Sequence, residues 1–149
     1  MHYEQIISTG TNFHAVIHAQ PVYLTYLSRV PRYQDEIYLN QHLLRWQPET
    51  IVNLPGGIGF IPFRIPGSPE LMTGNVECLR THRIVIWAKH GVMARSDISV
   101  KRAADLVEYA ETAAKYEYLN LRVNEVGVGL SAEDIRAICE THNVKQDIF

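Results

Sequence analysis

Two short apolar runs that each end at a histidine constrain the fold of this sequence more than any other feature. Residues 13–20 read FHAVIHAQ, and residues 84–91 read IVIWAKHG. Their length and their β-branched side chains are typical of buried strands. Because side chains alternate along a strand, His14, His18 and Gln20 fall on one face of the first run. A buried strand face gains nothing from such polar groups unless something binds them there.

Two strands that each carry an imidazole at one end can form a metal site, with His18 and His90 as the candidate ligands. Taken alone, either residue is more simply a buried histidine whose ring bonds a backbone carbonyl. Gly91 directly follows His90 and favours the metal interpretation, because a glycine lets the backbone turn and lets a substrate approach closely.

Periodicity, prolines and capping residues predict helices alternating with short strands, which indicates a layered α/β architecture. The predicted strands cover residues 13–20, 50–54, 58–63 and 83–88, with a hairpin return at 92–94. The predicted helices include one that ends within residues 1–8, and others at 22–27, 36–45, 69–80, 97–121 and 132–142. Their predicted N-caps are Ser68, Ser96, and Ser131 with Asp134.

The composition is that of an ordinary soluble domain. Of the 149 residues, 46% are hydrophobic and 20% are charged, and the net charge of −2 offers no basic surface for nucleic acid. No apolar run approaches the roughly 20 residues of a membrane helix, and the first residues lack a signal-peptide pattern. Cys78 and Cys139 form neither a disulfide framework nor a zinc motif. We therefore expect one cytoplasmic domain over residues 1–149.

Several blocks of the sequence resemble the class II (zinc-dependent) aldolase and adducin family. HAQ at residues 18–20 stands in the place of the family's His-x-His pair, and WAKHGV at 87–92 resembles its third-ligand motif. PET at 48–50, PGGIGFIP at 55–62 and IPGSPE at 65–70 are similar to the rhamnulose-1-phosphate aldolase branch. Blocks that match in order and spacing weigh more than one short motif.

The resemblance implies a three-layer α/β/α fold with a mixed, mostly antiparallel central sheet. Family members are longer: they begin with Gly-, Asn- and Ser-rich loops that hold the substrate phosphate, followed by a Ser-Glu-Leu-Pro segment with the acid/base glutamate. Neither pattern occurs in this sequence. We therefore expect an N-terminally incomplete domain, the C-terminal, metal-bearing part of a larger one.

The resemblance also implies that His18 and His90 bind a divalent metal, Zn²⁺ in the family, and that Gly91 lies at the substrate. Gln20 stands where the family has a ligand histidine, and an amide oxygen is a poorer zinc ligand than an imidazole. Gln20 therefore implies weaker binding, a harder metal, or a shell completed by a carboxylate or His14. It equally fits a hydrogen-bonding role beside the ligands.

Glu49 matches a glutamate that, in rhamnulose-1-phosphate aldolases, reaches the active site of a neighbouring subunit. The same residue also fits a solvent-exposed loop carboxylate, which is the commonest place for a glutamate. Because family members are tetramers, the resemblance implies a homo-oligomer in which Glu49 lies near a subunit boundary and acts catalytically.

The activity that the resemblance implies is retro-aldol cleavage of a ketose 1-phosphate, of the rhamnulose 1-phosphate type, to dihydroxyacetone phosphate and an aldehyde, lactaldehyde in the family. This cleavage leaves an enediolate, and a divalent Lewis acid stabilises its two adjacent oxygens. Two alternatives remain: a sugar-phosphate 4-epimerase of the same superfamily and a non-catalytic, adducin-like interaction domain. GIGFIP at residues 57–62 favours the aldolase, whereas Gln20 favours the adducin-like domain.

Overall fold

The computed structural model describes residues 3, 7, 10, 15–123 and 125–149. Its four strands are β1 (Ala15–Ala19), β2 (Gly59–Ile61), β3 (Ile84–Trp87) and β4 (Gly91–Ser96). They form one sheet in the order β1-β4-β3-β2, in which β4 pairs antiparallel with both β1 and β3, and β2 pairs parallel with β3. The α-helices with described bounds are α2 (Val22–Leu27), α3 (Glu36–Leu43), α4 (Pro48–Asn53), α5 (Pro69–Thr81), α6 (Val100–Arg122) and α7 (Ala132–His142).

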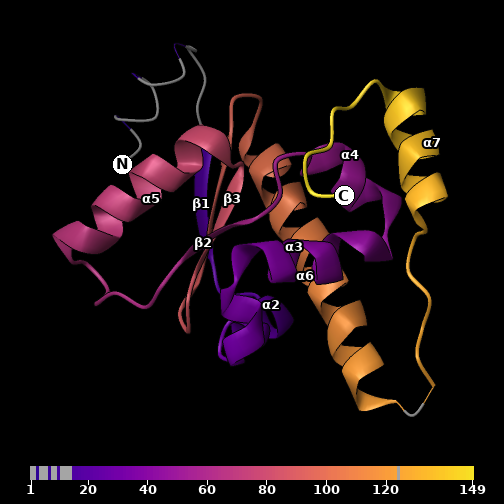
Figure 1. Ribbon diagram of the computed structural model, residues 1–149. Helices are drawn as coiled ribbons and strands as arrows, with labels where there is room; N and C mark the ends of the chain where they lie inside the picture. Colours follow the sequence, from indigo (N-terminus) through magenta and orange to yellow (C-terminus); the bar gives the residue numbers. More distant parts are fainter. Residues whose placement is uncertain (1–2, 4–6, 8–9, 11–14, 124) are drawn as a thin grey trace.

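Helices cover both faces of the sheet, which gives three layers (Figure 1). The alternation along β3 shows how the layers divide. Ile84 and Ile86 pack into a cluster with α2, α3 and α6, whereas Val85 and Trp87 pack into a second cluster with α5. The expected three-layer α/β/α fold with a mixed, mostly antiparallel sheet is confirmed.

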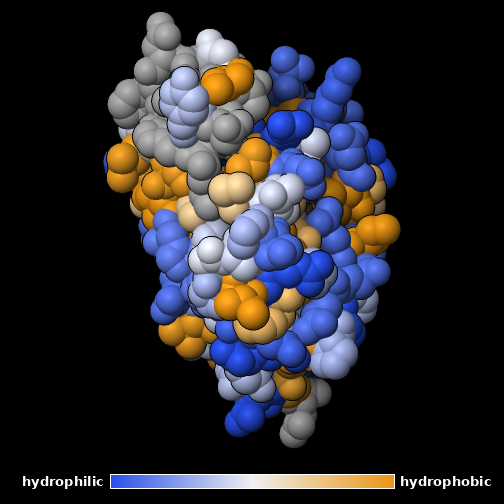
Figure 2. Space-filling view, turned by 90° about the vertical axis from the view of Figure 1, so that its left-hand side faces the viewer, coloured by the Kyte–Doolittle hydropathy of each residue, from blue (hydrophilic) through white to orange (hydrophobic). Residues whose placement is uncertain are grey.

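Among the helices with described bounds, α5 covers the second face of the sheet (Figure 1). Leu71 and Leu79 point from it toward the sheet, and Ser68 caps its first turn by accepting a 3.2 Å bond from the Leu71 N–H, as predicted. Seen from the side of α5, the surface mixes apolar side chains with polar ones rather than gathering them into one patch (Figure 2). The amphipathic pattern of α5 therefore turns its apolar side inward.

The predicted strand at residues 50–54 is wrong, because this segment forms α4. Its β-branched residues favour a strand by propensity. Two local signals favour the helix instead: Pro48 occupies the first turn, and Thr50 Oγ1 donates to the carbonyls of Leu44 and Gln47 at 2.6 and 2.7 Å. These bonds outweigh the strand propensity of three residues.

The predicted N-cap of the longest helix is also wrong. Ser99 caps α6, because its Oγ accepts the Arg102 N–H at 3.0 Å. Ser96 is instead the last residue of β4, where it pairs with Ala15 of β1. Its Oγ accepts the N–H groups of Ile98 and Ser99 and so shapes the turn that leads into α6.

The remaining predicted elements differ from the structure by a few residues. The hairpin of β3 and β4 and the start of α2 are as predicted, and the helix expected at 36–45 changes to a 3₁₀ turn at Leu44–Trp46. Ser131 and Asp134 form the predicted capping box of α7. His14 and most of the helix expected within residues 1–8 lie outside the described residues. Among the described residues, no helix has the length and apolarity to cross a membrane.

Helix α2 depends on α6 for its first turn. Only six residues long, it starts after Pro21 without a side-chain cap of its own, and so short a helix is marginal in isolation. The carboxylate of Glu111 in α6 accepts the backbone N–H groups of Tyr23 and Leu24, both at 2.9 Å. This bond pair fixes the chain directly after β1 and thus the place where β1 ends.

We expect Glu111→Ala to lower the free energy of unfolding by about 1–2 kcal/mol, because it removes a charged N-cap from α2. Glu108→Ala, on the same helix and exposed, is the matched control and should change it by less than about 0.5 kcal/mol. Urea denaturation measures both. Equal effects would mean that the loss comes from α6 itself and not from the cap.

Candidate functional site

Strand pairing brings the two predicted ligand histidines together. His18 lies opposite Met93, and Trp87 lies opposite Gly91, so the end of β1 sits beside the hairpin that carries His90. The imidazole centroids of His18 and His90 are 5.1 Å apart and their planes are inclined by 70°. Two imidazoles that share a tetrahedral ion, with bonds of about 2.0–2.1 Å, have centroids about 5 Å apart. The spacing therefore fits one shared ion.

His18 is held in one orientation from two directions. Its Nδ1 lies 2.9 Å from the carbonyl oxygen of Val92; a carbonyl only accepts, so Nδ1 carries the proton and Nε2 carries the lone pair. The ring stacks on Trp87 with centroids 4.8 Å apart. Trp87 Nε1 in turn donates to Asn75 Oδ1 of α5 at 2.7 Å. Helix α5 thus orients His18 through Trp87.

His90 sits in a turn that α2 clamps. The His90 N–H donates to the Trp87 carbonyl at 3.0 Å, and Lys89 has a positive φ of 66°. The Lys89 N–H donates to Ser28 Oγ at 2.9 Å, and Arg29 donates to the Lys89 carbonyl at 3.1 Å. The end of α2 therefore stabilises a left-handed conformation that a lysine rarely adopts.

The surroundings of His90 favour a neutral ring with an available nitrogen. Burial, and then the neighbouring His18, lower the pKa of His90, and a neutral imidazole is the form that binds a metal. His90 Nδ1 is buried and has no hydrogen-bond partner among the described residues. A buried polar atom of this kind is unfavourable unless a ligand reaches it. The residues present therefore fit a divalent ion.

Gly91 permits the close approach of β1. A Cβ at this position would lie 2.5 Å from the Ala19 carbonyl oxygen, and 3.2 Å from both Gln20 Cγ and His18 Cε1. The glycine thus makes room for the chain itself, and its contact with a substrate stays a prediction. The same distances place the Gln20 side chain beside His18, within reach of the histidine pair.

Glu49 is not part of this arrangement within one chain. It is exposed in the first turn of α4, and the last residue of α4, Asn53, accepts a bond from Arg83 immediately before β3. His90 follows Trp87, the last residue at the other end of β3, and the His18 ring lies beside it. In the part of the chain that the structure describes, no three His, Cys, Asp or Glu residues gather to hold a metal.

Sequence reasoning missed the residues that support the pair. Asn75 lies between Leu71 and Leu79 on the inward side of α5, and it is fully buried. A polar residue at a core position of an amphipathic helix is a signal that could have indicated a partner such as Trp87. Ser28 carries no comparable signal, because its role depends on a turn 61 residues further along the chain.

Comparison with known proteins assigns the family. Residues 2–118 match the class II aldolase and adducin N-terminal domain, and the chain belongs to this family. It is 24% identical over 142 residues to the rhamnulose-1-phosphate aldolase of Bacteroides thetaiotaomicron, across 95% of this chain and 52% of that protein. It is 28% identical over 140 residues to the enzyme of the same name from Yersinia pestis, across 93% and 49%.

Solved structures agree with the fold. A sugar-phosphate aldolase from Thermotoga maritima is 32% identical, with a TM-score of 0.66 over 76% of this chain and 47% of that chain. An L-fuculose 1-phosphate aldolase is 23% identical, with a TM-score of 0.65 over 95% and 62%. The chain spans about half the length of the curated relatives it matches.

Gly91→Ala should lower the free energy of unfolding by about 1–3 kcal/mol, because the new methyl group forces β1 away from β4 at His18. Gly74→Ala is the control, and we expect it to raise the free energy of unfolding rather than lower it. It lies inside α5, its Cβ would meet only Ile61 at an ordinary 3.7 Å, and it should stabilise by about 0.5–1 kcal/mol. Urea titration of both variants checks this, and an unaffected Gly91→Ala protein would contradict the packing at Gly91.

Proposed function

We propose that this chain is the metal-bearing part of a class II aldolase that cleaves a ketose 1-phosphate of the rhamnulose 1-phosphate type to dihydroxyacetone phosphate and an aldehyde. The observation that carries the proposal is the fixed pair of His18 and His90, 5.1 Å apart at adjoining strand ends. The rhamnulose-1-phosphate aldolases among its relatives support this substrate class.

His18, through Nε2, and His90 are the residues that would hold a divalent ion, Zn²⁺ by analogy with the family, with Gln20 beside them. The ion would supply the positive charge that the two adjacent oxygens of an enediolate need. The chain itself provides orientation: the Val92 carbonyl and Trp87 fix the His18 ring. Trp87 also covers one side of His18 with an apolar surface that excludes water.

Retro-aldol cleavage also needs a group that takes a proton from the substrate hydroxyl. Within the described residues no carboxylate completes the histidine pair. We assign Glu49 to this step or to its support, acting from a neighbouring subunit of a cytoplasmic homo-tetramer. Its exposure on α4 leaves its carboxylate available to another subunit.

The competing function is a non-catalytic, adducin-like interaction domain. Gln20 in the place of a ligand histidine favours it, as does the lack of a third His, Cys, Asp or Glu near the pair among the described residues. Metal binding separates the two, because an interaction domain has no use for a defined ion at His18 and His90. The 4-epimerase alternative shares the retro-aldol chemistry and differs in its product.

Metal binding is the first test. The chain should bind Zn²⁺ in isothermal titration calorimetry, His90→Ala should abolish binding, and Gln20→His should tighten it by adding an imidazole. His142→Ala, at an exposed residue of α7, is the control that leaves affinity unchanged. Equal Zn²⁺ affinity in the parent chain and in His90→Ala would contradict a metal site at His90. The interaction domain would then be the better interpretation.

Turnover is the second test. We expect the 149-residue chain alone to release little or no dihydroxyacetone phosphate from rhamnulose 1-phosphate, because among the described residues no carboxylate joins the histidine pair in a cluster that could hold a metal, and Glu49 is assigned to a neighbouring subunit. An enzyme-coupled assay for dihydroxyacetone phosphate measures this. Robust turnover that disappears in His90→Ala but persists in Glu49→Gln would show that another residue of this chain is the acid/base.

A further inference from the structure

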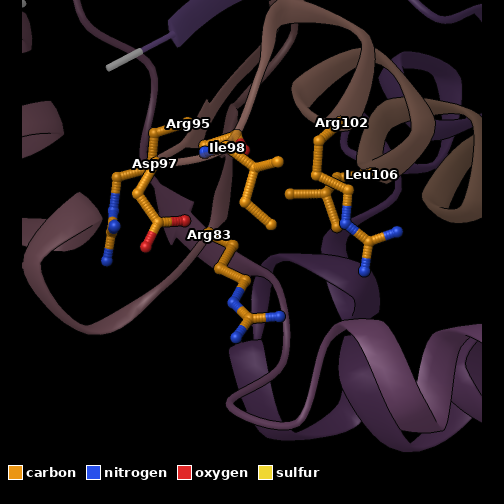
Figure 3. Close-up of a pocket in the computed structure, with 7 residues that line it drawn as sticks. Arg83, Arg95, Asp97, Ile98, Arg102 and Leu106 are labelled. Atoms are coloured by element: carbon orange, nitrogen blue, oxygen red, sulfur yellow. Dashed lines mark hydrogen bonds between the residues drawn. The ribbon is translucent and has the colours of Figure 1, made fainter. Parts of the chain in front are cut away.

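A polar cavity lies at the opposite end of the sheet from the histidine pair. It has a volume of about 210 Å³, and its charged lining consists of Arg83, Arg95, Arg102 and Asp97. Arg83 immediately precedes β3, Arg95 is in β4, and Arg102 is in the first turn of α6. Figure 3 shows Arg95 and Asp97 on one side of Ile98 and Arg102 on the other, with Arg83 below them. We call this cavity the arginine pocket.

Each arginine is anchored by one hydrogen bond, and Arg83 and Arg102 share their anchor, Asn53. Arg95 Nε donates to the Leu79 carbonyl at 2.6 Å, and Arg83 Nη1 donates to the Asn53 carbonyl at 3.1 Å. Arg102 donates through Nη2 to the side-chain oxygen of Asn53. A guanidinium has five N–H donors. Asn53 thus holds Arg83 and Arg102 next to each other at the pocket.

The described residues do not balance the positive charge of the arginine pocket. Among the described residues, none of the three arginines has a carboxylate oxygen within 4.0 Å. Three arginines against Asp97 leave a formal charge of +2 on the lining. Burial lowers the pKa of Arg95, and Arg83 acts in the same direction against the opposing effect of Asp97. Holding these cations together is unfavourable unless an anion joins them.

The N-terminus of α6 adds to the positive potential in the arginine pocket. The helix has 23 residues and begins at Val100, and the cavity is bounded by residues 96–98 directly before it and by Arg102 inside its first turn. The N-terminus of a helix carries partial positive charge and attracts anions. The helix dipole and the arginine side chains of the lining therefore both favour an anionic ligand.

We propose that the arginine pocket binds the phosphate group of a small phosphate ester, at a site separate from the histidine pair. Arginines bind phosphate oxygens through paired N–H donors, and a phosphate dianion matches a lining of charge +2. The volume of about 210 Å³ has room for a phosphate with a few carbon atoms attached. The net charge of −2 for the whole chain argues against a nucleic-acid backbone.

The two sites are distinct because β3 separates them. Arg83 stands one residue before this strand and Trp87 is its last residue, which places them about 13 Å apart along the strand at about 3.3 Å per residue. His90 lies beyond Trp87 in the turn that follows. A phosphate bound by the arginines would therefore not be the phosphate of a substrate at His18 and His90.

Calorimetric titration with inorganic phosphate and with glycerol phosphate, at constant ionic strength and with EDTA present, tests this proposal. Both should bind saturably, the ester at least as tightly as the free ion. Arg83→Gln and Arg102→Gln should each weaken binding about tenfold, through loss of a charge-assisted bond. Asp97→Asn should tighten it several-fold, because it removes the opposing charge. Arg136→Gln on exposed α7 is the control and should change nothing.

Two further measurements distinguish a phosphate site in the arginine pocket from a phosphate site at the histidines and from a contact between two copies. Phosphate binding should persist in His90→Ala, so loss of binding in that variant would overturn the proposal and assign the phosphate to the histidine site. Sedimentation of the parent chain and of Arg83→Gln should give the same mass. A dimer that dissociates in Arg83→Gln would show instead that an acidic group of a second copy fills the pocket. Binding of the free ion but not of the ester would overturn the ester assignment.

Discussion

The pairing of β1 with β4 is the constraint on which the rest of the site depends. Antiparallel pairing fixes which face each side chain occupies, and a slip of one residue would turn His18 to the α6 side of the sheet. The register that places His18 opposite Met93 is possible only because Gly91 lets the Ala19 carbonyl approach so closely. A backbone contact without any charge or catalytic group thereby decides whether two imidazoles can meet.

Helix α2 links that contact to the rest of the fold. Its first turn is capped by Glu111 of α6, and its last residues hold the hairpin turn through Ser28. The same helix α6 carries Arg102 in its first turn. The histidine pair and the arginine pocket therefore depend on one long rigid element, at positions about 14 Å apart along its axis, at about 1.5 Å per residue from Arg102 to Glu111.

Local patterns predicted most of the fold, and what was missed came partly from local signals given too little weight and partly from contacts between distant segments. Alternation along residues 13–20 placed His18 correctly, and Ser68 and Ser131 cap helices as their positions indicate. The strand predicted at 50–54 failed because its β-branched residues carried more weight than Pro48, and the bonds of Thr50 depend on the folded chain. The stacking of His18 on Trp87 follows from the tertiary fold alone, as does the lining of one pocket by Arg83, Arg95 and Arg102.

At position 20 the backbone determines where the side chain points, whereas the residue type determines what it can bind. Gln20 Cγ lies beside Gly91 and His18 because the backbone at the end of β1 directs it there. Any side chain at this position starts in the same direction, beside His18. An amide in that place offers a weaker donor to zinc than an imidazole. Under the proposed function, His18 and His90 are the two strong ligands, and residue 20 sets how firmly an ion is held.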